Sequence, residues 1–82
     1  MKIVLADLVV EVLKDAPPPV QRAFDKQLRF LAVNLHHPSL HAKKYDESTG
    51  RWQARVNKNW RFYFEIIDDT YRILKLIPHP KK

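Results

Sequence analysis

Two arginines, Arg55 and Arg61, have the types and spacing best suited to chemistry in this chain of 82 residues. They flank residues 57–59 (Asn-Lys-Asn), a segment typical of a turn between two strands. Side chains alternate along a strand, so both arginines lie on the face opposite the aromatic residues of segment 51–66. A three-residue turn sets the two arginines directly opposite each other. Guanidinium groups bind phosphate oxygens well, so this pattern predicts an anion-binding face.

The facing arginines also predict something about stability. Like charges directly opposite each other across two strands destabilise a sheet by roughly a few tenths of a kcal/mol. We therefore expect Arg61→Ala to leave the melting temperature level or slightly higher at low salt. That gain should fade as added salt screens the charges.

Other polar residues are expected on the same face. In this register Gln53 lies opposite Tyr63, while Lys43 and Lys44 approach from the preceding connector. Cations clustered with a tyrosine are typical of a surface that binds nucleic acid. The alternative is a solvated basic face whose side chains splay apart, because one face of a two-layer sheet is often wet.

The last predicted strand contributes one more cation to this face. If Leu74 and Leu76 point into the core, Lys75 lies on the polar face. The opposite alternation, with Tyr71 and Ile73 inward, would bury the ammonium group of Lys75. We therefore expect the first alternation.

Other kinds of site find little support in the sequence. His37 and His41 are four residues apart, but Pro38 disfavours a helix that would present both to a metal. We interpret them as loop histidines in contact with solvent. The chain has no cysteine and a single glycine, which excludes thiolate chemistry and glycine-rich phosphate loops. No metal and no cofactor are expected.

The charge balance favours a polyanionic partner. Lys and Arg number 15 against 9 Asp and Glu, a formal net charge of +6. Such a balance suits nucleic acid or an acidic protein segment. Acidic residues interrupt the apolar run of the first 16 residues, so neither a signal peptide nor a membrane contact is expected. A cytoplasmic protein is the natural expectation.

Hydrophobic periodicity predicts the elements that carry these residues. Residues 2–5 are expected to form a strand, and Asp7 to cap a short helix that ends before the prolines 17–19. The prolines can open a second helix. Its apolar stripe recurs at helical spacing and comprises Val20, Phe24, Leu28, Leu31 and Leu35.

A polar connector at 36–50 is expected to lead into three strands, at about 51–57, 60–67 and 70–77. The aromatic face of these strands must be covered by the helices. The sequence thus predicts a single α+β domain, residues 1–82, in the order β-α-α-β-β-β. It has two layers, with a helical hairpin packed on one face of a small antiparallel sheet.

Three segments, HPSLHAKKYD, WQARVNKNWRFYFEI and DDTYRILKLIPHPK, resemble in order and spacing the RelE/ParE toxin superfamily of bacterial toxin–antitoxin systems. The resemblance covers nearly the whole chain, from Lys2 to Lys81. It implies a RelE-like domain and, in the RelE branch, a metal-independent ribonuclease that cuts mRNA in the ribosomal A site. It also implies an acidic antitoxin as partner. The ParE branch poisons DNA gyrase on the same scaffold.

The resemblance assigns roles to individual residues. Arg55 and Arg61 match its basic strand positions, and His79 falls near a C-terminal histidine or arginine of the family. Gln53 departs from the lysine or arginine frequent there in the nuclease branch. Arg55, Arg61 and His79 are the expected catalytic groups. Arginines stabilise the negative charge that develops on the phosphorane, and an imidazole is suited to proton transfer. The expected RNA-binding residues are Lys43, Lys44, Arg51, Tyr63, Lys75 and Lys81.

Two other functions remain open at this point. The chain could be a non-catalytic or gyrase-directed ParE-like member that binds anionic partners with the same face. It could also be a basic protein-interaction module that binds an acidic partner. The mRNA-cleaving toxin is the leading prediction.

Overall fold

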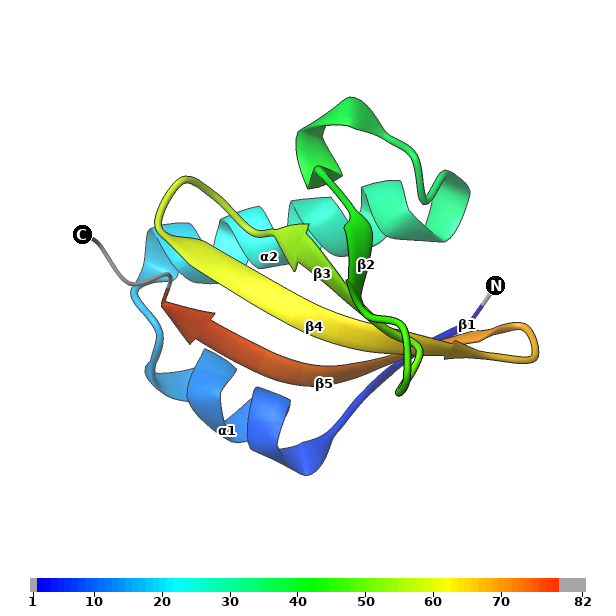
Figure 1. Ribbon diagram of the computed structural model, residues 1–82. Coiled ribbons are helices and arrows are strands. Elements are labelled where there is room, and N and C mark those ends of the chain that lie inside the picture. Colours follow the sequence, from blue (N-terminus) through cyan, green and yellow to red (C-terminus); the bar gives the residue numbers. More distant parts are fainter. Residues whose placement is uncertain (1, 79–82) are drawn as a thin grey trace.

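The structure, a computed structural model, describes residues 2–78 as a five-stranded sheet covered by two helices (Figure 1). The predicted two-layer α+β fold is confirmed. In chain order the elements are β1 (Lys2–Leu5), α1 (Asp7–Asp15), α2 (Pro18–Val33), the 3-10 helix η1 (Pro38–Leu40), β2 (Lys43–Asp46), β3 (Arg51–Arg55), β4 (Trp60–Ile67) and β5 (Thr70–Pro78).

The strands lie in the order β1-β5-β4-β3-β2, and all neighbours are antiparallel except β1, which runs parallel to β5. Strand β2 is an addition to the predicted order, because it falls in the segment expected to be a connector. It is an edge strand with exposed residues at 43–45, so it lacks the apolar alternation by which a buried strand is recognised.

Both helices begin close to the expected places. Helix α2 begins at Pro18, a position where the missing amide hydrogen costs no helical bond. Helix α1 begins at Asp7 itself, with Ala6 as its N-cap and no side-chain capping bond, so the predicted capping role of Asp7 was wrong. An acidic residue in the first turn still interacts favourably with the helix dipole.

One hydrophobic core lies between the helices and the sheet. We call the sheet face that carries Ala54, Phe62 and Phe64 the inner face, and the opposite one the outer face. Phe24 of α2 meets Phe62 edge-on, with ring centroids 5.5 Å apart. The largest fully buried side chains are Val9, Phe24, Leu31, Leu40, Phe62, Phe64, Ile73 and Leu76.

Strand β5 departs from the simple alternation expected of it. Ile73 and Leu76 are both buried, although three positions separate them. The register shifts beside Leu74, which has no partner in β4. This bulge turns the strand so that Tyr71 and Ile73 can be buried while Lys75 stays exposed. The prediction for Lys75 is confirmed, but the inward position of Leu74 and the outward position of Tyr71 and Ile73 were wrong.

Candidate functional site

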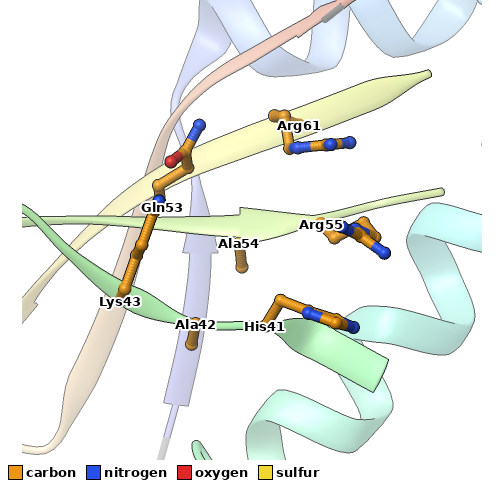
Figure 2. A pocket seen from close by; sticks show the side chains of 7 residues that line it. All are labelled: His41, Ala42, Lys43, Gln53, Ala54, Arg55 and Arg61. Atoms are coloured by element: carbon orange, nitrogen blue, oxygen red, sulfur yellow. The ribbon is translucent and has the colours of Figure 1, made fainter. Parts of the chain in front are cut away.

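A cationic pocket of about 450 Å³ lies where the end of η1 meets strands β2, β3 and β4 (Figure 2). The predicted pairing of Arg55 with Arg61 across β3 and β4 is present, and both side chains line this pocket. Among residues 2–78 its lining includes no carboxylate, so the positive charges meet no opposite charge from the described lining residues. The lining residues are His41, Ala42, Lys43, Gln53, Ala54, Arg55 and Arg61.

Arg61 is held by the turn that precedes it. Its Nη1 donates to the carbonyl oxygens of Asn57 at 2.8 Å and of Trp60 at 3.0 Å. Partial burial, and then the charge of Arg55, lower the pKa of Arg61 from its ordinary value. The direction reflects a positive charge that is desolvated and faces another positive charge. An anion in this pocket would relieve both effects.

Arg55 is less well satisfied than Arg61. Its Nε is buried and has no hydrogen-bond partner among the described residues. Buried polar groups are normally hydrogen-bonded, so an unpaired donor needs an explanation. This donor belongs to the side chain of Arg55, and the same residue lines the cationic pocket.

The backbone around Arg55 is fixed by Gln27, a residue that sequence reasoning missed. This side chain is only 3% exposed on α2. Its Nε2 donates to the carbonyl oxygen of Arg55 at 2.8 Å and to that of Ser39 at 3.0 Å. The Ser39 hydroxyl donates in return to Gln27 Oε1 at 2.8 Å. We call these three residues the amide clamp; it ties α2, η1 and β3 together.

His41, interpreted from the sequence as a loop histidine in contact with solvent, is a further residue of the pocket whose role there was not predicted. It is exposed, follows η1 directly and lines the cationic pocket with Arg55 and Arg61. In Figure 2 its ring extends along the side of the pocket where both guanidinium groups lie. The backbone of His41 is left-handed, with φ of 47°, which is uncommon outside glycine but less so for histidine. Its sequence position, just beyond a proline turn, was the available signal.

A smaller aromatic pocket of about 80 Å³ continues the outer face toward β5. Tyr45 and Tyr63 meet edge-on there, with ring centroids 4.9 Å apart. The Tyr63 hydroxyl accepts a hydrogen bond of 3.1 Å from Gln53, which lines the cationic pocket. The two pockets therefore form one continuous surface, here called the basic strip. The smaller pocket is lined by Tyr45, Arg51, Tyr63, Lys75 and Ile77.

Solved toxin structures share this architecture. A YoeB/ParE toxin from Agrobacterium tumefaciens matches with a TM-score of 0.81 at 12% identity, over 98% of this chain and 100% of that one. A chain of the archaeal RelE–RelB complex from Pyrococcus horikoshii OT3 matches with a TM-score of 0.84 at 20% identity, over 99% and 97%. The chain has the RelE/ParE toxin fold.

The isolated E. coli RelE toxin is a further match, with a TM-score of 0.78 at 8% identity, over 99% of this chain and 86% of that one. Neither a protein-family model nor a curated protein sequence matches the chain significantly. The chain therefore shares this fold with toxins to which it is only 8–20% identical.

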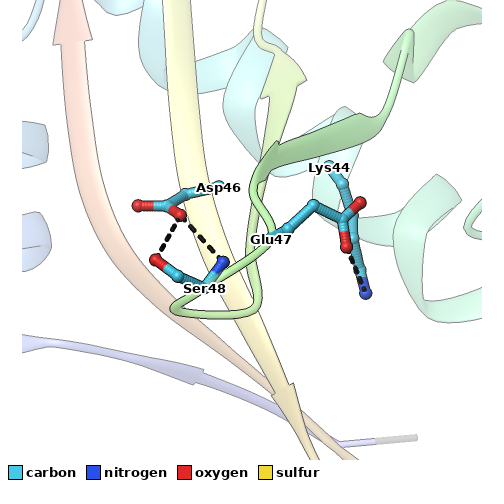
Figure 3. Close-up of polar contacts among 4 residues, drawn as sticks. All are labelled: Lys44, Asp46, Glu47 and Ser48. Carbon is cyan, nitrogen blue, oxygen red and sulfur yellow. Dashed lines mark hydrogen bonds and ion pairs between the residues drawn. The ribbon is translucent and has the colours of Figure 1, made fainter.

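Lys44, one of the predicted RNA-binding residues, lines neither pocket of the basic strip. The Lys44 ammonium lies over the ring of Trp52, 5.9 Å from its centroid. It also lies 3.9 Å from a carboxylate oxygen of Glu47 (Figure 3). Neighbouring residues of a strand point to opposite faces, so Lys43 reaches the cationic pocket and Lys44 does not. The structure thus brings together Lys43, Arg51, Arg55, Arg61, Tyr63 and Lys75 but not Lys44.

The turn after β2 holds its own acidic group. Asp46 Oδ1 accepts hydrogen bonds from the Ser48 hydroxyl at 2.8 Å and from the Ser48 amide at 3.0 Å (Figure 3). These bonds lower the pKa of Asp46 from its ordinary value, the hydroxyl contributing most. Asp46 is thereby engaged in the turn, and it does not line the cationic pocket.

The remaining expectations concern histidines and the end of the chain. His37 stacks on Phe30 with centroids 3.8 Å apart, and its Nδ1 accepts a bond from the Ser39 amide, so it has a structural role. His79 and Lys81 lie outside the described residues. Within residues 2–78 no three His, Cys, Asp or Glu side chains gather where they could hold a metal. None of the helices described is long and apolar enough to cross a membrane.

Proposed function

We propose that this chain is the toxin of a toxin–antitoxin pair and inhibits translation by cutting ribosome-bound mRNA without a metal cofactor. The observation that carries the proposal is the cationic pocket, where Arg55 and Arg61 face each other without a carboxylate in the lining. The fold shared with structures described as RelE, YoeB and ParE toxins supports the same function.

The proposed chemistry is attack of a ribose 2′-oxygen on the adjacent phosphorus, with departure of the 5′-oxygen of the next nucleotide. Negative charge develops on the phosphorane oxygens, where fixed positive donors are most effective. Arg61 is fixed by the turn carbonyls, and Arg55 lines the same pocket. The two arginines are the proposed charge-stabilising groups, and His79 remains the acid–base residue predicted from the sequence.

The basic strip is the proposed path of the RNA strand. Tyr45 and Tyr63 can stack a nucleobase beside the cationic pocket, while Arg51 and Lys75 flank them and can contact phosphates. Base stacking on an aromatic ring is worth about 1–3 kcal/mol in single-strand binding and tolerates any base. This arrangement suits an unpaired message rather than a duplex, whose bases are covered.

The proposed protein partner is an acidic antitoxin segment that orders as it binds. Similar structures include a RelB–RelE antitoxin–toxin complex from Methanococcus jannaschii and a YoeB–YefM toxin–antitoxin complex from Staphylococcus aureus. The net charge of +6 favours an acidic partner here as well. Ribosome-bound mRNA places the proposed site of action in the cytoplasm. A reading frame adjacent to this one should encode a small protein that co-purifies with the chain.

The decisive experiment is to induce the chain in bacteria and map mRNA 5′ ends across the transcriptome. Codon-phased cuts on translated messages are the expected result, and an Arg55→Ala/Arg61→Ala double variant should produce none. DNA damage without cuts would instead identify gyrase as the target. Unimpaired growth with neither lesion would leave only a protein-binding role and would contradict the proposal.

A further inference from the structure

We propose that His41 is the general base of the cationic pocket, taking the proton from the attacking 2′-hydroxyl of a ribonucleotide. The inference rests on the proposed function, because it assigns a residue to the same RNA cleavage. It is independent of His79, which lies outside the described residues.

The lining of the pocket leaves one candidate for this role. Arg55, Arg61 and Lys43 carry donors and no acceptor when protonated, and the Gln53 amide is not basic. The other two described lining residues are alanines. Among the described residues of this lining, His41 is therefore the one whose side chain has a basic nitrogen that can accept a proton.

The position of His41 is built into the fold. It follows η1, and its amide donates to the carbonyl oxygen of Pro38 at 3.4 Å. The amide clamp binds η1 to β3 through Gln27, which contacts both Ser39 and the carbonyl oxygen of Arg55. The same buried side chain therefore holds the backbone of η1, which directly precedes His41, against the backbone of Arg55. A proton acceptor and a charge-stabilising group must keep a fixed spacing for such a reaction.

The backbone conformation of His41 also supports a functional role. A non-glycine residue at positive φ costs free energy, and such strain concentrates at functional sites. With a φ of 47°, His41 follows the end of η1 and lines the pocket. His41 is exposed, so the cost is not offset by burial of its ring.

The step conserves protons and electrons. His41 accepts the 2′-hydroxyl proton while the 2′-oxygen forms a bond to phosphorus, and Arg55 and Arg61 hold the negative charge. The bond from phosphorus to the 5′-oxygen then breaks, and this oxygen takes a proton from water or from a general acid such as His79. The products are a 2′,3′-cyclic phosphate and a 5′-hydroxyl.

The test compares His41→Asn with His36→Asn. Asparagine tolerates a left-handed backbone but does not titrate, and His36 is an exposed loop histidine outside the pocket lining. Ribosomes stalled on a defined mRNA serve as substrate, and the same message with a 2′-deoxy nucleotide at the mapped cut reports binding. Loss of a general base should slow single-turnover cleavage by about 10²-fold or more. Binding of the deoxy message and the melting temperature should stay unchanged.

Two further readouts identify the proton transfer. The cleavage rate of the wild-type protein should rise with pH as the general base His41 loses its proton. Lys43, Arg55 and Arg61 are the charged side chains that line the pocket with it. The His41→Asn variant should lose this rise. A 5′-thio leaving group needs no general acid, so it should not rescue His41→Asn. Rescue would make His41 an acid and overturn the assignment.

The inference and the proposed function fail separately. If the wild type cuts RNA and His41→Asn cuts within a few-fold of it, the inference is wrong and the proposed function stands. The inference is also wrong if the variant loses binding in parallel with cleavage. If the wild type cuts no RNA on any ribosome complex, the proposed function falls and the inference falls with it.

Discussion

The two ends of the β3–β4 hairpin differ in whether an acidic residue lies beside their arginines. At the far end from the turn, Glu65 lies opposite Arg51 and forms an ion pair of 3.2 Å with Arg72. At the turn end, Arg55 lies opposite Arg61, and neither forms an ion pair within residues 2–78. Both ends share the same sheet register, so the difference comes from residue choice rather than from backbone geometry.

The comparison separates charge used for structure from charge left for a ligand. Pairing Glu65 with Arg72 satisfies both groups inside the protein. In the cationic pocket no carboxylate among the described lining residues faces the two guanidinium groups, at a cost in stability of roughly a few tenths of a kcal/mol. Sites that hold unfavourable charges in this way are typically under selection for function rather than stability.

The largest expected effect is loss of activity at the turn end. Arg55→Ala should slow RNA cleavage by about 10²- to 10³-fold, the usual result of removing a donor to developing negative charge. Arg72→Ala, at the other end, should cut within a few-fold of the wild type. Single-turnover cleavage of ribosome-bound mRNA measures both. Equal losses in the two variants would show that the two ends do not differ in function.

The next effect concerns the clamp that fixes the turn end. Gln27→Leu keeps the side-chain bulk but leaves the carbonyl oxygens of Arg55 and Ser39 without their amide donor. Stranded buried groups of this kind lower the free energy of unfolding by about 1–3 kcal/mol each. Gln21→Leu is the matched control, because Gln21 also donates to a backbone carbonyl, Leu13 at 2.8 Å, but is only half-buried. Urea unfolding should give a clearly smaller loss for the control.

The sequence predictions were accurate where an element buries one face, and less accurate where its residues are exposed. The hairpin register was predictable because one face is aromatic, and a slip of one residue would expose that whole face. The stripe of α2 was predictable from Val20 to Leu31 for the same reason, since burial enforces helical spacing, but Leu35 lies beyond the end of the helix at Val33. Two features had no such signal: β2 has exposed residues along its edge, and the bulge at Leu74 is a single-residue shift that alternation alone does not reveal.

The candidate site was predictable only in part, for a related physical reason. Arg55 and Arg61 are neighbours through local pairing, so their juxtaposition follows from the hairpin. His41 reaches them only because η1 folds back onto β3, a tertiary contact made through a buried amide. Gln27 itself reads as a surface residue of an amphipathic helix until its partners are known.

A third prediction distinguishes the two facing arginines by stability. Arg61 donates to two turn carbonyls at 3.0 Å or less, each bond worth about 1 kcal/mol net, which outweighs the repulsion from Arg55. The expectation from sequence that Arg61→Ala melts level or higher is therefore reversed, and we expect a loss of about 1–2 kcal/mol. Arg55→Ala removes an unpartnered donor and should melt level or slightly higher.

Thermal melts at two salt concentrations test this difference. Any gain from Arg55→Ala should shrink as salt rises, because screening weakens the repulsion that it removes. The loss from Arg61→Ala should persist, since hydrogen bonds to carbonyls depend little on salt. If Arg55→Ala and Arg61→Ala lower the melting temperature by the same amount at low and at high salt, Arg55 has a structural partner and its Nε is not held for a ligand.

The smallest expected effect lies at the far end of the hairpin. Glu65→Gln removes the carboxylate that pairs with Arg72 but keeps a side chain of similar shape. The pair is partly exposed, with the Glu65 side chain 24% and the Arg72 side chain 53% accessible. Its loss should lower the free energy of unfolding by less than about 1 kcal/mol.

The salt dependence of this last variant has the opposite sign to that of Arg55→Ala. Screening weakens attraction at Glu65 and repulsion at Arg55, so the penalty of Glu65→Gln should shrink with salt while the benefit of Arg55→Ala shrinks too. As salt rises, the stability of Glu65→Gln should therefore approach that of the wild type from below, and the stability of Arg55→Ala should approach it from above. Because the same salt series reports both ends of one hairpin, a shared direction of change would refute the contrast between them.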